Sequence, residues 1–116
     1  MNRTNSLNSE IRISGSLTPK GGFAGTFTPL MRAAAMGHVE RLLELLAEGA
    51  EVNARGPRDS TALMFAAGAG HVDIVKILVE HGADLDAREA GGWTALCHAR
   101  EDGETEIVQF LEGYRN

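Results

Sequence analysis

The chain has 116 residues, which is room for one domain, and 43% of them are apolar but only 5% aromatic, as in a thin core of small side chains. Its net charge of −5 disfavours a nucleic-acid partner, because binding to phosphates needs an excess of Lys and Arg. The single cysteine, Cys97, excludes an internal disulfide and a thiolate metal site, and no apolar stretch approaches the roughly 18 residues of a membrane span.

Residues 1–25 are predicted to form an N-terminal arm that is mostly flexible. Asn, Ser, Thr and Gly dominate this segment, and only the alternating run Ile11-Arg12-Ile13 is typical of a strand. Residues 1–22 lack the apolar centre of a signal peptide, so the expected location is the cytoplasm. A repeat domain is expected to follow, from residue 26 to residue 116.

A tripeptide recurs at a spacing of 33 residues, as Thr28-Pro29-Leu30, Thr61-Ala62-Leu63 and Thr94-Ala95-Leu96. A fixed period of this length is typical of a solenoid, whose units bury their apolar faces only by stacking on one another. We therefore predict an all-α solenoid of three helix-turn-helix repeats with short β-turn-like loop tips. The repeats span about residues 26–58, 59–91 and 92–116.

Each repeat carries the signals of two short helices. The threonine is a helix N-cap, and Pro29 stands at the first helical position, where its missing N–H costs nothing. The first helices are expected to end at Gly37, Gly70 and Gly103, and the second helices to begin near Val39, Val72 and Thr105. Gly49 and Gly82 are expected to end the second helices.

The pattern Thr-Pro-Leu-x-x-Ala-Ala-x-x-Gly-His begins at Thr28 and is followed by a predicted helix, and the run Gly-Ala-Asp-Leu-Asp-Ala begins at Gly82. Together these features resemble the ankyrin repeat. The resemblance covers residues 26 to about 114. It implies a module that binds other proteins and has no catalytic activity. The family's usual histidine after Thr-Pro-Leu is replaced by Met31, Met64 and Cys97, so apolar packing is expected in place of its hydrogen bonds between units.

The two ends of the array depart from the repeat pattern. The first repeat has Arg32, Arg41 and Glu44 where the second has Phe65, Ile74 and Ile77. In the third repeat Arg100 and Glu112 replace apolar residues, and such polar groups are costly to bury. The sequence therefore predicts a complete, capped array. Leu43 takes a position that is polar in the other repeats, so we hypothesise that the arm covers it through Leu17 or Phe23.

No residue pattern indicates catalysis, a cofactor or a metal. The four histidines occupy positions that the repeat explains, and His38 and His71 are expected to lie roughly 10 Å apart, too far to share one zinc ion. The acidic cluster around Gly103 lacks the apolar pocket that raises the pKa of a catalytic carboxyl group. We interpret the cluster as a solvated edge of the last repeat.

The resemblance implies that partners bind at the loop tips and along the exposed side of the first helices. Aromatic and arginine side chains dominate binding hot spots, which favours Trp93 and Phe27, although both rings could instead pack on neighbouring tips. The predicted binding residues are Phe27, Met36, Arg58, Ser60, Ala69, Trp93, Glu101 and Asp102.

The expected partner is another protein, with a basic surface as one option. Residues 84–116 hold eight acidic and three basic residues, and this excess favours the approach of a basic partner to the C-terminal end. A monomer is expected. Two alternatives stay open: a structural protein that self-associates through the arm or the tips, and a small inhibitory or antidote-type subunit of an enzyme.

Overall fold

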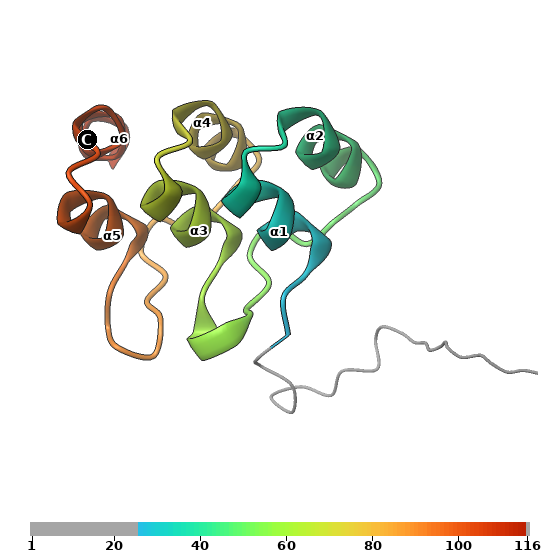
Figure 1. The fold of residues 1–116 in the computed structure, drawn as a ribbon, viewed down its shortest axis with the longest axis horizontal. Coiled ribbons are helices and arrows are strands. Elements are labelled where there is room, and N and C mark those ends of the chain that lie inside the picture. Colours follow the sequence, from blue (N-terminus) through green and yellow to red (C-terminus); the bar gives the residue numbers. More distant parts are fainter. Residues whose placement is uncertain (1–25, 116) are drawn as a thin grey trace, which may run out of the picture.

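In the computed structural model, which describes residues 26–115, three pairs of short antiparallel helices stack side by side (Figure 1). The described residues form no strand. The pairs are α1 (Pro29–Met36) with α2 (Val39–Ala47), α3 (Ala62–Ala69) with α4 (Val72–Glu80), and α5 (Ala95–Glu101) with α6 (Thr105–Arg115). A 3-10 helix, η2 (Pro57–Asp59), lies in the loop before α3. The predicted all-α solenoid is confirmed.

The boundaries of α1 and α3 follow the predicted caps, whereas α2 and α4 are capped by Glu48 and His81, one residue before the predicted Gly49 and Gly82. In each repeat the threonine hydroxyl oxygen accepts a hydrogen bond from the backbone N–H three residues later, at Met31 (3.1 Å), Met64 (3.4 Å) and Cys97 (3.3 Å). Gly37 and Gly70 end α1 and α3 in the left-handed conformation, with φ of 78° and 83°. In the third repeat the cap residue of α5 is Asp102, and Gly103 takes the left-handed conformation one residue later.

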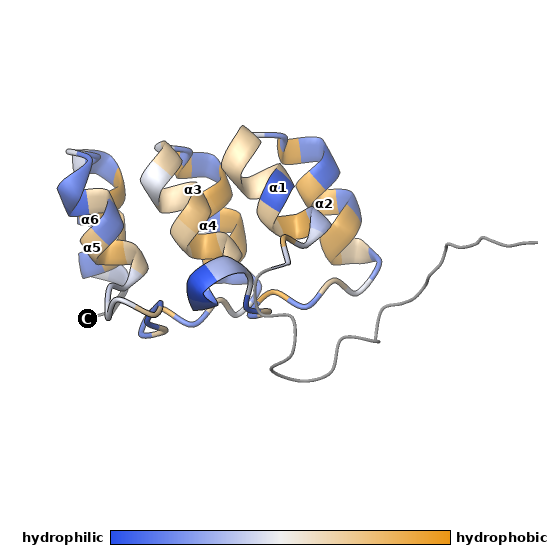
Figure 2. Cartoon of the chain, turned by 60° about the horizontal axis from the view of Figure 1, so that its bottom comes forward, coloured by the Kyte–Doolittle hydropathy of each residue, from blue (hydrophilic) through white to orange (hydrophobic). Residues whose placement is uncertain are grey.

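Helix α3 is the centre of the packing. It contacts α1 on one side, α5 on the other and α4 behind it. Its sequence contains no polar side chain, and Figure 2 shows it as almost wholly apolar. Leu63, Met64, Ala66 and Ala67 are buried, and the alanines at these contacts allow the inner helices to approach closely. The helices α1, α3 and α5 thus form an inner row, and α2, α4 and α6 an outer row (Figure 1).

Met31 and Met64 occupy the place of the family's usual histidine, and both are buried. The Met31 side chain lies against Gly56 in the following loop, where a Cβ atom would stand only 2.5 Å from the Met31 sulfur. Cys97 is half-buried, and its sulfur accepts a hydrogen bond from the Thr94 hydroxyl at 3.4 Å. Met31 thus packs on the loop of its own repeat, and the expected apolar packing between units at this position stays a prediction.

Other residues supply polar links between neighbouring repeats. The Asn53 side-chain amide donates to the Gly82 carbonyl oxygen (3.1 Å), and its Oδ1 accepts from the Asp84 backbone N–H (2.8 Å). Between the loop tips, the Ala90 N–H donates to the Arg58 carbonyl oxygen at 2.7 Å. These bonds join each loop to the next, so adjacent tips hold a defined separation.

The end faces of the described array carry charged side chains. Arg32, Arg41 and Glu44 are exposed on the first repeat, and Arg41 pairs with Glu44 at 3.2 Å. On the last repeat Arg100 pairs with Glu112. Leu43 is exposed on α2. The residues proposed to cover it, Leu17 and Phe23, lie outside the described residues, as do the predicted arm and its short strand.

Gly37 and Gly49 provide a matched test of the packing between repeats. Both have positive φ, so replacement by alanine is expected to cost about 1–2 kcal/mol of unfolding free energy at either position. At Gly37 a Cβ atom would also stand 2.8 Å from the His71 ring, whose Nε2 lies 3.2 Å from the Ala35 carbonyl oxygen. At Gly49 the space is open. Urea denaturation should therefore show Gly37→Ala to be less stable than Gly49→Ala by about 1 kcal/mol or more.

Equal losses of stability in the two variants would contradict the tight packing of His71 on the first repeat.

Candidate functional site

The exposed side chains of α1, α3 and α5, together with the loops that precede α3 and α5, form one continuous surface that we call the inner face. Figure 2 turns this surface toward the reader. Two hollows border it, and the first extends onto the end face of the array, where it reaches Arg41 of α2. A hollow of about 310 Å³ is lined by Phe27, Pro29, Arg32, Ala33, Met36, His38 and Arg41. A second, of about 230 Å³, is lined by Arg58, Glu89, Gly91, Trp93 and His98.

Two aromatic rings rise from the inner face and are held by stacking. Phe27 packs on Phe65 of the next repeat, with ring centroids 5.2 Å apart. Trp93 packs on His98 of its own repeat, also at 5.2 Å. The residues remain 48% and 38% exposed, so both are structural and available for contact at once. Both stacking partners are helix residues, Phe65 of α3 and His98 of α5, and the role of the two rings in binding stays a prediction.

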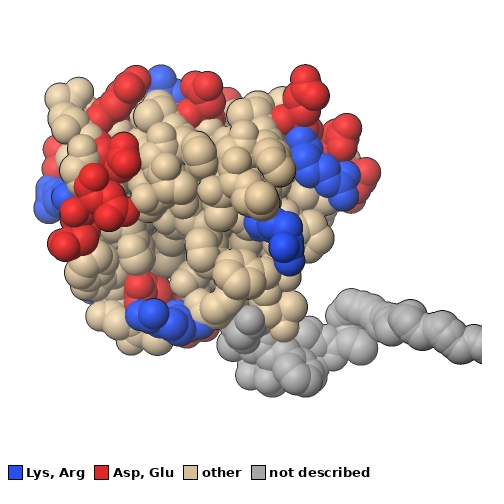
Figure 3. Space-filling model, viewed as in Figure 1, with Lys and Arg blue, Asp and Glu red and all other residues tan. Residues whose placement is uncertain are grey.

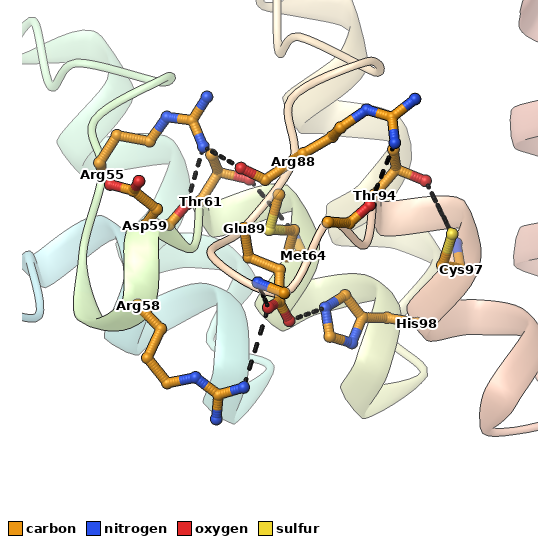
Figure 4. Close-up of polar contacts among 12 residues, drawn as sticks. Arg55, Arg58, Asp59, Thr61, Met64, Arg88, Glu89, Thr94, Cys97 and His98 are labelled. Carbon is orange, nitrogen blue, oxygen red and sulfur yellow. Dashed lines mark hydrogen bonds and ion pairs between the residues drawn. The ribbon is translucent and has the colours of Figure 1, made fainter.

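A buried carboxylate organises the loop before α5 (Figure 4). The Gly91 N–H donates to Glu89 Oε1 at 2.8 Å, and His98 Nε2 lies 3.1 Å from Glu89 Oε2. Arg58 approaches from η2, with its Nη2 atom 3.8 Å from Glu89 Oε1. The Glu89 side chain is only 8% exposed. The hydrogen bond from Gly91, helped by the charges of His98 and Arg58, lowers the pKa of Glu89.

Glu89 is not among the predicted binding residues. The one feature of the sequence that points to it is its difference from the equivalent residue of the previous repeat. The equivalent residue one repeat earlier is Gly56, so a carboxylate appears at a position where the previous repeat has no side chain. Arg58, which was selected, lies at the tip of η2 with a φ of 56°, and the next residue, Asp59, has a φ of 66°. This unusual backbone directs the Arg58 guanidinium toward the following loop.

The other predicted binding residues fall into separate places on the inner face. Met36 is 58% exposed in the hollow that Phe27 and Arg32 line. Ser60 is half-buried, and its carbonyl oxygen accepts a hydrogen bond from the Gly56 N–H at 2.7 Å, which closes the tip. Ala69 is exposed on α3.

Glu101 and Asp102 are exposed at the end of α5. The Asp102 carboxylate leans over α3, since its Oδ2 would lie 3.6 Å from a Cβ atom at Gly68. Six of the eight predicted residues thus form three groups along one face, rather than one cluster. Phe27 and Met36 are at the first repeat, Arg58 and Trp93 are at the loops, and Glu101 and Asp102 are at the third repeat.

The described residues also bear on metal ligation, membrane spanning and thiol chemistry. Within residues 26–115, no group of three His, Cys, Asp or Glu side chains is placed to hold a metal ion. No helix in the same range is long and apolar enough to cross a bilayer. Hydrogen bonds from the Thr94 hydroxyl and backbone lower the pKa of the Cys97 thiol, but that side chain packs at the start of α5 and lines neither hollow of the inner face.

The stacked helix pairs and their caps agree with a comparison to known families. The family model described as ankyrin repeats, in three copies, matches residues 30–115. The chain belongs to the ankyrin repeat family. Ankyrin repeats are generally protein–protein interaction modules without catalytic activity. None of the curated proteins compared with the chain is similar enough to match it.

The lowered pKa of Glu89 leads to a pH-dependent prediction. An acid whose pKa is lower in the folded state stabilises the fold when it is ionised, and that contribution is lost as pH falls through the folded pKa. Glu89→Gln should therefore be less stable than the parent protein from pH 7 down to about pH 5. The difference should shrink below about pH 4.5, the ordinary value, as the parent's own carboxylate becomes protonated.

Thermal unfolding of both proteins across this range measures the difference, with the exposed Glu48→Gln as control. A gap between parent and Glu89→Gln that stays constant down to pH 3 would contradict the role of the charged carboxylate.

Proposed function

We propose that this ankyrin repeat protein is a non-catalytic binding module that holds another protein on its inner face. The observation that carries the proposal is the distribution of exposed apolar side chains. Five large hydrophobic residues are exposed within the described range: Phe27, Met36, Leu43, Trp93 and Tyr114. Three of these lie on the inner face, Phe27 and Met36 at one hollow and Trp93 at the other, and exposed apolar side chains on one face are a feature of interaction sites.

The same face combines the residue types that dominate binding energy. Trp93 and Arg58 flank one hollow, and tryptophan and arginine are enriched among hot-spot residues. Trp93 is positioned before binding by its stacking on His98, and Arg58 lies within ion-pair distance of Glu89. Side chains that are already ordered lose less entropy when a partner binds. The protein is proposed to act as a monomer in the cytoplasm, where its single thiol stays reduced.

Removal of the Trp93 side chain should weaken binding of the partner more than any other single substitution on the inner face. The partner recovered with the full-length protein from its own cells should bind Trp93→Ala at least about tenfold more weakly, and Arg58→Ala with a smaller loss. Leu43→Ala is a matched control, since Leu43 is a similarly exposed apolar residue on the outer helix α2. Calorimetric titration measures the three affinities, and circular dichroism checks that each variant is folded.

Unchanged affinity in the double variant Trp93→Ala/Arg58→Ala, or an equal loss in Leu43→Ala, would overturn the assignment of the inner face.

A further inference from the structure

The charges of the inner helices change sign along the array. Helix α1 (Pro29–Met36) has one charged residue, Arg32, and α3 (Ala62–Ala69) has none. Helix α5 ends at Glu101 and is followed by Asp102. Arg100, the other charged residue of α5, pairs with Glu112 of α6. The inner helices are therefore basic at the first repeat, uncharged at the second and acidic at the third, while the loop tips carry their own charges at Arg58 and Asp59.

Arg32 differs from the other basic side chains in the described part of the chain. Arg41, Arg58 and Arg100 pair with carboxylates, Arg55 and Arg88 donate to backbone carbonyls, and Lys76 lies over the Phe110 ring. Arg32 is exposed and has no such partner among residues 26–114. Its guanidinium borders the hollow that also contains Phe27 and Met36.

The acidic end of the face is equally unpaired. Glu101 and Asp102 are exposed, and neither carboxylate lies within ion-pair distance of a described basic side chain. Figure 3 shows acidic side chains gathered over the α5 and α6 end of the molecule. Between the two charged ends, Phe65 and Gly68 of α3 are partly exposed and Ala69 is exposed, and we call these three residues the apolar strip because α3 has no polar side chain. Unpaired opposite charges at the two ends of one apolar strip are suited to a ligand of complementary polarity.

We propose that the inner face binds a segment of its partner protein in one direction only. An acidic side chain of the segment lies at Arg32, apolar side chains cover the strip from Phe65 to Ala69, and basic side chains lie at Glu101 and Asp102. The proposal rests on the proposed function, because it assigns the chemistry of the partner at the same face. A reversed segment would bring like charges together at both ends, which favours one orientation over the other.

The repeat spacing sets the length of this segment. Packed helices lie roughly 8–10 Å apart, so two repeat steps separate the basic end from the acidic end by about 20 Å. That distance corresponds to about six residues of extended chain or about 13 residues of helix. The acidic and basic side chains of the partner are expected at one of these separations.

Selection from a displayed library of random 20-residue peptides tests the direction of binding. The full-length protein should enrich peptides with an acidic residue and a basic residue on either side of an apolar stretch, always in the same order. A synthetic peptide of the selected order should bind at least tenfold more tightly than the same peptide with its charges exchanged. The ratio of the two affinities should fall as salt is added, because salt screens exposed charges.

A variant with the charges of the face exchanged, Arg32→Glu/Glu101→Lys/Asp102→Lys, should enrich the opposite order. All three side chains are exposed, so the fold is expected to survive, which circular dichroism checks. Glu80→Lys is the matched control, since it changes the net charge by the same amount on the outer helix α4. The control should enrich the same order as the parent protein.

The outcomes separate the two proposals. The selected peptides could carry their charges in either order and still bind Trp93→Ala or Met36→Ala more weakly than the parent protein. That result would overturn the fixed direction of binding but leave the proposed function standing. If the protein enriches no peptides, or if neither Trp93→Ala nor Met36→Ala weakens the binding of the selected peptides, both proposals would be overturned. A self-associated parent protein that Arg32→Glu converts to a monomer in sedimentation would show that the face binds a second copy, which also overturns the proposal.

Discussion

The burial of α3 is the constraint on which the rest of the structure depends. Its eight residues include no polar side chain, so the helix is stable only when α1, α4 and α5 cover it. Three sides are covered, and the fourth exposes Ala69 and part of Phe65 and Gly68 to solvent. The packing that holds the repeats together therefore also creates the apolar middle of the inner face. Stability and binding surface have the same origin.

The loops extend this surface because they are tied to one another. Arg55 donates from Nη1 to the carbonyl oxygens of Asp59 (2.7 Å) and Arg88 (2.9 Å), so one guanidinium shapes its own loop and holds the next (Figure 4). Glu89 then gathers Gly91, His98 and Arg58 beside Trp93. Backbone that is fixed in this way presents its side chains at set distances, which reduces the entropy lost on binding. This rigidity suits a scaffold that acts by contact.

Some features were predictable from the sequence because they depend on local rules. Threonine caps, left-handed glycines and the 33-residue period determine the helices, and all of them recur in each repeat. The Glu89 network was not predictable, because the positions of its partners depend on how the loops and helices of neighbouring repeats stack. Glu89 replaces Gly56 of the previous repeat, and its partners come from three segments of the chain. The stacking of Phe27 on Phe65 likewise depends on the separation of two repeats.

The central claim is that the inner face, and no other surface, binds the partner. Amide chemical-shift mapping of the full-length protein during titration with its partner tests this most directly. We predict shifts in α1, α3, α5 and the loops at residues 56–60 and 89–93, with the outer helices α2, α4 and α6 largely unaffected. Shifts concentrated on the outer helices, with unchanged signals at Trp93 and Met36, would contradict the claim.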